Sequence, residues 1–155
     1  IDTDLEILIT DEYVESITER LSLYQRLDNC ESEEELLSMK QELSDRFGPI
    51  PQQVEDLFVT VRCRKLAVDL GFEKMSLKDN TLRCFFINRP DSPYFESHTF
   101  QKMIQYLQTQ TNKGKLKQTG RLFLLTASPV GSMEAVHHFL QPLHAWCFSG
   151  TPIPV

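Results

Sequence analysis

The stretch SEEELLSMKQELSDRFGPIPQQVEDL, residues 32–57, holds two helix starts and one helix stop. Ser32 and Glu35 form a capping box, in which each side chain is expected to bond to a backbone amide of the other. Four apolar residues at helical spacing follow on one face: Leu36, Met39, Leu43 and Phe47. Gly48 stands where a left-handed cap ends a helix, and Pro49 forbids continuation. Pro51 suits the first turn of the next helix, because it has no N–H to leave unsatisfied.

Two further helices are predicted on either side of this segment. The earlier helix is expected to open at Asp11 and Glu12, and its apolar residues recur at steps of three and four: Tyr13, Ile17, Leu21, Tyr24 and Leu27. The later helix starts at Pro51, ends at Gly71 and carries one face of six residues: Val54, Leu57, Phe58, Val61, Lys65 and Val68. Residues 13–70 therefore predict three consecutive helices whose short joints force them to pack against their neighbours.

The pattern changes to strands after Gly71. Residues 73–88 alternate around Asp79-Asn80, which predicts a β-hairpin. A fourth helix is expected after Ser97, a strand over 121–127, and a last helix from about Ser132. The predicted fold class is α+β: three N-terminal helices, then a small mixed sheet in the order β-β-α-β-α with helices packed on it.

The chain reads as one domain with short extensions. It opens with IDTDLEILIT, without a methionine or a signal-peptide pattern, so residues 1–12 are expected to be the tail of a preceding domain or a linker. Residues 13–148 are expected to form the domain. The Gly- and Pro-containing end, 149–155, is expected to be a flexible tail.

Charge is distributed unevenly along the chain. Residues 1–45 hold fourteen acidic and three basic residues, whereas residues 46–155 hold eight acidic and thirteen basic residues. This asymmetry argues against nucleic-acid binding by the first part and favours a basic protein partner for it. The alternative is that the acids simply stabilise helix starts through the helix dipole, as at Glu33 to Glu35.

No catalytic, metal or membrane signature is found in the sequence. Glycine-rich phosphate loops and nucleophile motifs are absent, and Glu42 and Asp45, one helical turn apart, are expected to stay ionised at an exposed helix end. The four cysteines are too widely spaced to favour a zinc site, and reduced thiols predict a cytoplasmic protein. No apolar run reaches the roughly 18 residues of a membrane span.

Two segments carry a family resemblance. R-L-x-x-Y-x-R at residues 20–26 and E-L-x-x-x-K-x-E-L-x-D-R-F-G-x-x-P at 35–51 resemble the C-terminal domain of the bacterial transcription-repair coupling factors, the Mfd or TRCF family. The opening residues resemble the way that chains of this family leave their translocase motor. The resemblance is strong over residues 1–72, and beyond them it rests on the order of the elements.

The resemblance implies a regulatory domain that acts in nucleotide excision repair. The parent protein is a DNA translocase that removes stalled RNA polymerase and recruits UvrA; its motor, which uses ATP and Mg²⁺, lies outside this chain. The C-terminal domain is expected to need no cofactor, to catalyse nothing, and to dock on the N-terminal UvrB-like module, masking the UvrA-binding surface. The docking residues implied are Glu42 and Asp45, facing arginines of that module, with Arg46 beside them.

A second hypothesis is an accessory nucleic-acid-binding domain. It would use basic residues between positions 62 and 121: Arg62, Arg64, Lys65, Lys113, Lys115, Lys117 and Arg121. The first three also fit an ordinary exposed helix face. The alternating lysines also fit a strand edge, where lysine prevents sheet-to-sheet association.

Overall fold

The computed structural model describes residues 1–109 and 114–149. It divides the chain into two compact units, which we call the helical unit, Glu6–Val61, and the sheet unit, Ile1–Leu5 with Arg62–Val155. The predicted α+β class is confirmed. Fourteen acidic and four basic residues give the helical unit a net charge of −10, and the sheet unit is left with +4.

The helical unit contains α1 (Ile17–Asp28), α2 (Glu33–Phe47) and the first part of α3 (Gln52–Leu70). Its core joins these helices to the segment that precedes them, which supplies Ile9 and Val14. The buried members from the helices include Leu23, Leu27, Leu36, Met39, Leu43, Val54 and Phe58. The expectation of three helices with short joints is therefore confirmed.

The boundaries of α2 follow the sequence prediction with two differences in detail. Ser32 Oγ accepts from the Glu35 amide at 3.2 Å, but Glu35 Oε2 accepts from the amide of Glu31 at 2.9 Å rather than from that of Ser32. Gly48 has the predicted positive φ, 90°, but its ψ of −167° lies outside the left-handed helical region. That conformation belongs essentially to glycine alone.

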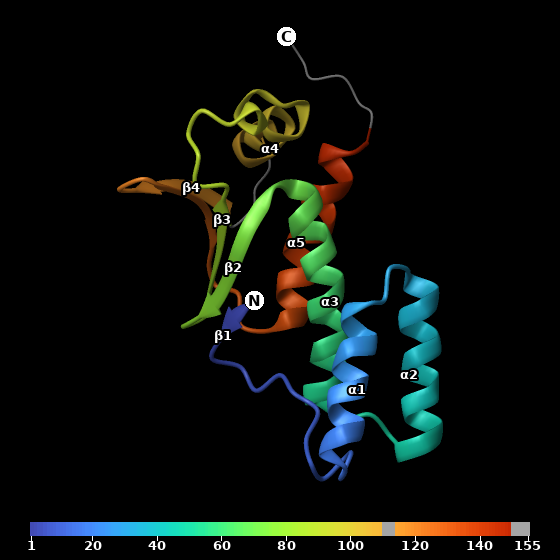
Figure 1. Cartoon of the computed structure of the whole chain (residues 1–155). Helices are drawn as coiled ribbons and strands as arrows, with labels where there is room; N and C mark the ends of the chain where they lie inside the picture. Colours follow the sequence, from blue (N-terminus) through green and yellow to red (C-terminus); the bar gives the residue numbers. More distant parts are fainter. Residues whose placement is uncertain (110–113, 150–155) are drawn as a thin grey trace. The chain divides into compact units, whose positions relative to one another are not determined.

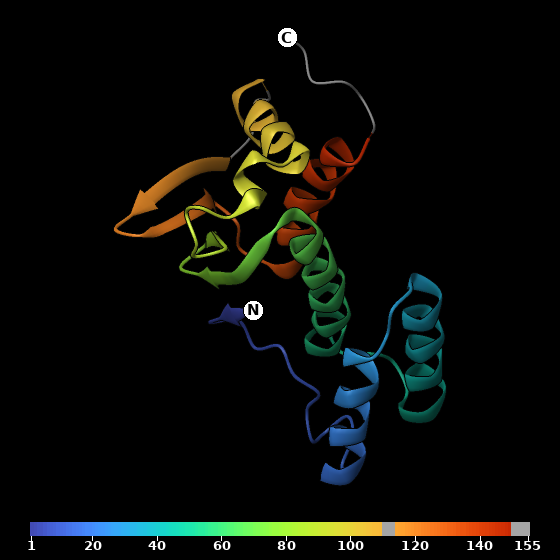
Figure 2. The ribbon, with the colours of Figure 1, turned by 45° about the horizontal axis from the view of Figure 1, so that its top comes forward.

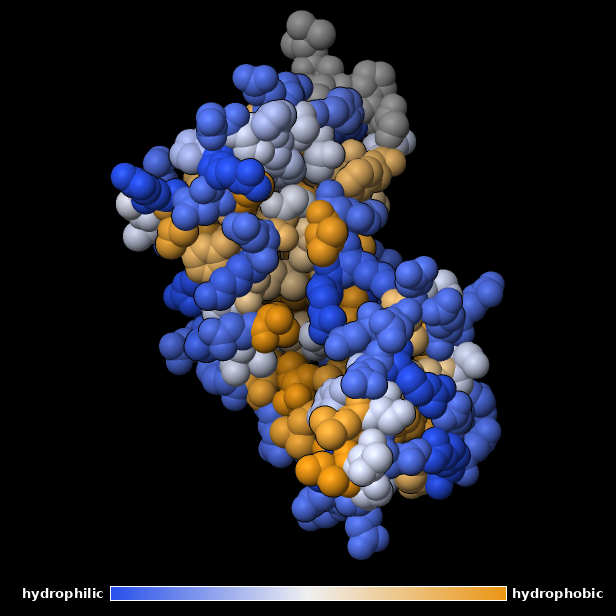
Figure 3. Space-filling model, viewed as in Figure 1, coloured by the Kyte–Doolittle hydropathy of each residue, from blue (hydrophilic) through white to orange (hydrophobic). Residues whose placement is uncertain are grey.

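The predicted buried stripe of α1 is wrong in two positions. The helix begins at Ile17, because Ser16 caps it by accepting from the Glu19 amide at 3.2 Å. Ile17 and Leu21 are 65% and 58% exposed, and the buried positions are Leu23 and Leu27. Because Tyr13 precedes the helix, the stripe that begins with it does not describe one helical face, and packing in the unit buries the i,i+4 pair Leu23 and Leu27 instead. Figure 3 shows apolar surface where α1 lies.

The second half of α3 also differs from the prediction. Val68, expected on the buried face, is 68% exposed, and Lys65 is half-buried. The residues of this half that are buried are Cys63, Ala67 and Leu70. They pack within the sheet unit, which needs a different face of the helix from the one buried in the helical unit.

The sheet unit is built on five described strands in the order β1-β2-β3-β5-β4. They are β1 (Asp2–Thr3), β2 (Phe72–Lys78), β3 (Thr81–Phe86), β4 (Gly114–Thr119) and β5 (Leu122–Ala127). Only the short β1 runs parallel to its neighbour, β2. The β2–β3 hairpin is as predicted, with positive φ at Asp79 (52°) and Asn80 (56°). β1 and β4 are additions to the predicted order of elements.

The helices of the sheet unit cover one face of the sheet. In Figure 1, α5 (Met133–Cys147) and the end of α3 lie on one side of it. The short η1 (Pro93–Glu96) leads to α4 (His98–Thr109), whose Phe100 packs against Phe86 of the same face at 5.5 Å between ring centroids. Ser97 and Ser132 cap α4 and α5 as predicted. Of the predicted flexible tail, residues 150–155 lie outside the described residues.

Candidate partner-binding surface

The three predicted docking residues lie in the last turns of α2. Leu43, between Glu42 and Asp45, is fully buried, so the helix fixes the direction in which its neighbours project. Glu42 is half-buried, whereas Asp45 and Arg46 are exposed. The structure therefore brings the three residues to one end of α2, but it gives them different surroundings.

Glu42 is held by arginines from two helices. Arg26 of α1 donates from Nη1 and Nη2 to the two carboxylate oxygens at 2.7 and 2.9 Å, and Arg46, one turn along α2, donates at 3.2 Å. Arg46 also pairs with Glu19 of α1. These four residues, which we call the α1–α2 ion network, join the later part of α2 to the first turn of α1, through Glu19, and to its last turn, through Arg26. Spacing along the sequence does not reveal Arg26 and Glu19 as partners, because it reports only neighbours on the same helix.

The ion network lowers the pKa of Glu42. The hydrogen bond from Arg26 is the largest cause, that from Arg46 adds to it, and together they bring the pKa to about 2 from 4.5. The pKa values of Arg26 and Arg46 are raised by the same bonds, with Glu19 as the main contributor for Arg46. Glu42 is thus charged at neutral pH, and its charge is already compensated inside the chain.

Asp45 differs from Glu42 in having no such compensation. In the part of the chain that the structure describes, its carboxylate forms no ion pair, and the side chain is exposed. The other cation of α2 besides Arg46, Lys40, pairs with Glu55 of α3 at 2.7 Å. Of the predicted pair, Asp45 is therefore the acid that is available to a cationic partner.

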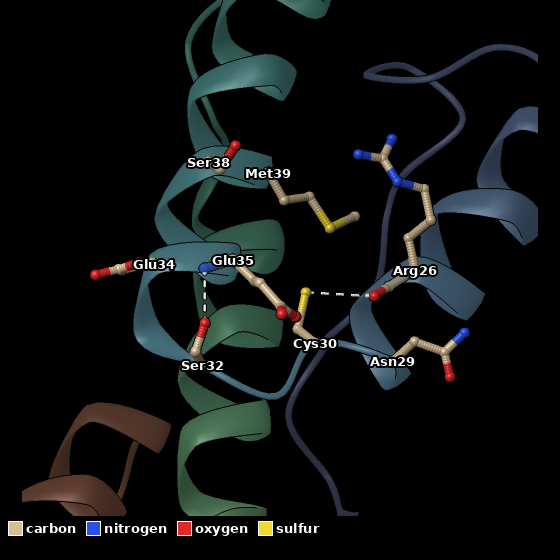
Figure 4. Close-up of a pocket in the computed structure, with 8 residues that line it drawn as sticks. All are labelled: Arg26, Asn29, Cys30, Ser32, Glu34, Glu35, Ser38 and Met39. Carbon is tan, nitrogen blue, oxygen red and sulfur yellow. Dashed lines mark hydrogen bonds between the residues drawn. The ribbon is translucent and has the colours of Figure 1, made fainter.

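An open groove adjoins the ion network at the end of α1 and the start of α2, and Arg26 belongs to both. It has a volume of about 560 Å³ and is lined by residues from the end of α1 and the start of α2, among them Arg26, Cys30, Glu34 and Met39. Figure 4 shows the Cys30 thiol directed at the Arg26 carbonyl oxygen, at 3.3 Å, and Ser32 bonded to Glu35. These polar groups already bond within the chain, so the groove shows no set of groups converging on a reacting atom.

The basic residues of the alternative hypothesis do not form one surface. Arg62, Arg64 and Lys65 lie on α3, and Arg62 and Arg64 both interact with other groups. Lys115 and Lys117 lie on β4, and Arg121 lies in the turn that leads to β5. Lys113 lies outside the described residues. The α3 residues and the β4 residues are thus separate groups.

The described residues offer neither a set of metal ligands nor a reactive thiol at Cys63 or Cys147. Within residues 1–109 and 114–149, no group of His, Cys, Asp and Glu residues could hold a metal ion. Burial raises the pKa of Cys63 to about 12 and that of Cys147 to about 11, which keeps both thiols protonated. Over the same residues, no helix is long and apolar enough to cross a membrane.

Comparison with known proteins decides the family. The TRCF domain matches residues 3–97, which is more than half of the chain. The chain belongs to the TRCF domain family. The resemblance carried by the motifs at residues 20–26 and 35–51 is therefore confirmed, and the match extends past the helices into the sheet unit of this TRCF domain.

Individual relatives agree with the family. The transcription-repair-coupling factor of Rickettsia conorii is 29% identical over 122 residues, covering 79% of this chain and 10% of the relative. That of Escherichia coli is 37% identical over 68 residues, covering 44% of this chain and 6% of the relative. The chain thus spans about a tenth or less of the length of these relatives.

A solved structure agrees with the fold. The crystal structure of the C-terminal domain of a transcription-repair coupling factor superposes with a TM-score of 0.74 at 15% identity. The superposition covers 97% of this chain and 96% of the other. Our TRCF chain therefore has the fold of a C-terminal domain from this family, including the part after residue 97 that the family match does not reach.

Proposed function

We propose that this TRCF domain is a non-catalytic regulatory domain that docks, through the end of α2, on the N-terminal UvrB-like module of its parent protein. Docking would mask the UvrA-binding surface and hold an ATP- and Mg²⁺-dependent DNA translocase in a repressed form. The observation that carries the proposal is the exposed, uncompensated Asp45 beside the α1–α2 ion network in a chain of this family.

The charge of the helical unit supports an interaction with a basic protein surface. Its net charge of −10 favours encounter with a cationic partner, and Asp45 offers an exposed carboxylate in the last turn of α2. A partner tethered in the same chain needs only modest affinity, because tethering raises its effective concentration. The exposed Ile17 and Leu21 add apolar area of the kind that protein partners cover.

Within this proposal, the three predicted residues have different roles. Asp45 would contact the partner directly. Glu42 and Arg46 would hold α1 and α2 together, so that the end of α2 is presented in one orientation. Glu42 is less available than Asp45 to a partner arginine, because its carboxylate oxygens already accept three hydrogen bonds, which leaves about one of its four acceptor sites.

Titration of this chain against the isolated N-terminal module tests the proposal. Asp45→Arg should weaken binding at least tenfold, since an attraction to arginine becomes a repulsion. Glu34→Arg is the matched control: it makes the same charge change at an exposed position of α2, but near the opposite end of the helix. Equal binding by wild type and Asp45→Arg would contradict the proposed docking surface.

A further inference from the structure

The sheet has a second face, opposite the helices, on which basic residues gather. Side chains alternate along each strand, and the inner face carries the buried Met75, Leu77, Leu82, Cys84 and Phe86. The residues between them point to the other side. We call this side the basic face; its cations are Lys74, Lys78, Arg83, Lys115 and Lys117.

Strand register places four of these five cations in two neighbouring rows, and Lys78 lies opposite Thr81 in a third row. One row runs Asp2, Ser76, Arg83, Thr126, Lys115 across all five strands, and the next runs Lys74, Phe85, Leu124, Lys117. Neighbouring strands lie about 4.8 Å apart, and three such intervals separate β2 from β4, so Lys74 and Lys117 lie about 14 Å from each other across one row. Phe85 lies between them.

The charges of the basic face are largely uncompensated. Lys78 pairs with Asp2 at 3.0 Å, and Asp2 is the acid of these two rows. Among the described residues, Arg83, Lys115 and Lys117 form no ion pair. The four lysines are exposed, and Arg83 is half-buried. Figure 2 shows the β4–β5 hairpin extending away from the helices, with β4 as the outermost strand.

An aromatic ring lies among these cations. Phe85 is half-buried on the basic face, and the Lys74 ammonium lies 5.7 Å from its ring centroid. Ser76 and Thr126, which flank Arg83 in the neighbouring row, are buried, and Thr126 Oγ1 donates to the Lys115 carbonyl oxygen at 3.4 Å. Cations that track a phosphate backbone, combined with an aromatic ring on which a base stacks, are the means by which open sheets bind unpaired nucleic-acid strands.

We propose that the basic face of the sheet binds an unpaired nucleic-acid strand, with Arg83, Lys115 and Lys117 contacting phosphates and Phe85 stacking on a base. The cations lie about one nucleotide apart along β4, where Lys115 and Lys117 are separated by about 6.7 Å. This interaction is independent of the proposed docking through α2, since the two surfaces belong to different units.

Fluorescence anisotropy with a labelled oligothymidylate tests the proposal on this chain. Binding should be strong at low salt and weaken steeply between about 50 and 200 mM salt. Lys115→Gln with Lys117→Gln should lower the affinity at least tenfold. It should also reduce the slope of log affinity against log salt by about 1.4, which is 0.7 for each lost phosphate contact. Phe85→Leu, which keeps an apolar side chain without a ring, should lower the affinity about tenfold.

Two controls test whether binding depends on this face and on the chemistry of a nucleic acid. Arg64→Gln with Lys65→Gln removes the same charge from α3 and should leave the affinity unchanged. Polyglutamate of matched charge should compete far less well than the oligonucleotide. The proposal would be overturned if the chain did not bind the oligonucleotide at low salt. It would also be overturned if the α3 variant lost as much affinity as the β4 variant. A third contradicting result is that polyglutamate competes as well as the oligonucleotide while Phe85→Leu binds normally. If the Lys115 and Lys117 variant fails to fold by circular dichroism, Lys74→Gln with Lys117→Gln tests the same face.

Discussion

Glu42 belongs to a family motif, yet its carboxylate stabilises the contact between α1 and α2 of its own chain. It lies in the family motif at residues 35–51, but its carboxylate accepts two hydrogen bonds from Arg26 and one from Arg46. About one acceptor site of this carboxylate is left for a partner. Asp45, three residues later, has no such bonds among the described residues, which is why the proposed docking rests on it.

The ion network predicts a pH dependence of stability. The folded pKa of Glu42, about 2, lies below its ordinary value of 4.5, so its contribution is complete above the ordinary value and is lost as pH falls toward 2. The side chain is 37% exposed, and solvent screening limits the effect to about 1 kcal/mol or less. In urea unfolding, Glu42→Gln should be less stable than wild type at pH 7, and the difference should shrink below pH 4.5 and vanish as pH falls through about 2.

Glu12→Gln is the control for this measurement. It removes the same charge from an exposed residue that, within the described ranges, forms no ion pair, so its effect should not change across the same pH range. A Glu42→Gln stability difference that persists unchanged at the acidic end would show that the ion network is not its source.

At the scale of the element, α2 could be predicted because its signals are local. Ser32, Glu35 and Gly48 act on backbone groups within a few residues, and the structure differs only in which amide Glu35 bonds and in the ψ of Gly48. The start of α1 is predicted less well, because the apolar stripe from Tyr13 to Leu27 indicates a helix that begins before Ile17. The pair Ser16 and Glu19 has the spacing of a capping box and could have located that start.

The strands and the ion network show what local signals leave out. β1 has two residues and forms only by pairing with β2, more than seventy positions away, so nothing within its own sequence indicates a strand. Arg26 and Glu42 come together because α1 and α2 pack side by side, which depends on the whole helical unit. Predictions from spacing therefore found the residues of the candidate site without their partners.

Two glycines with nearly the same φ offer a matched test of the loops between elements. Gly48 and Gly71 have φ of 90° and 92°. A Cβ on Gly48 would meet nothing within 4 Å, whereas one on Gly71 would lie 2.3 Å from the ring of Tyr94. Gly48→Ala should cost roughly 1 to 3 kcal/mol from backbone strain alone, and Gly71→Ala should cost more because of the added clash.

Urea unfolding of both variants measures the difference. Repeating the two substitutions in a Tyr94→Ala background should bring their costs together, since the ring that causes the clash is gone. Equal losses of stability for the two variants in the wild-type background would show that the Tyr94 ring moves aside at no cost in free energy. The packing of η1 against the end of α3 would then be looser than the structure indicates.

At the scale of the whole molecule, folding is expected to need no metal. The reason is that the cores of the two units are built from apolar side chains, and that the described residues contain no metal-binding group. Thermal unfolding followed by circular dichroism should give the same midpoint with and without a strong chelator. A midpoint that falls on chelator addition would contradict this expectation.

The two units also divide the charge of the chain between them. The helical unit carries −10 and the sheet unit +4, so a cationic protein and an anionic nucleic-acid strand would be drawn to different units. Asp45→Arg and Lys115→Gln with Lys117→Gln should therefore affect separate binding partners. An Asp45→Arg chain that binds oligothymidylate as wild type does would agree with this division.

The most direct test of the proposed regulatory role is the ATPase rate of a full-length coupling factor that contains this domain. If Asp45 holds the domain against the N-terminal module, Asp45→Arg should raise the rate in the absence of RNA polymerase and should expose the surface that binds UvrA. Glu34→Arg, at the other end of α2, should leave both unchanged. An Asp45→Arg protein that folds normally, yet keeps the wild-type ATPase rate and UvrA binding, would contradict the account.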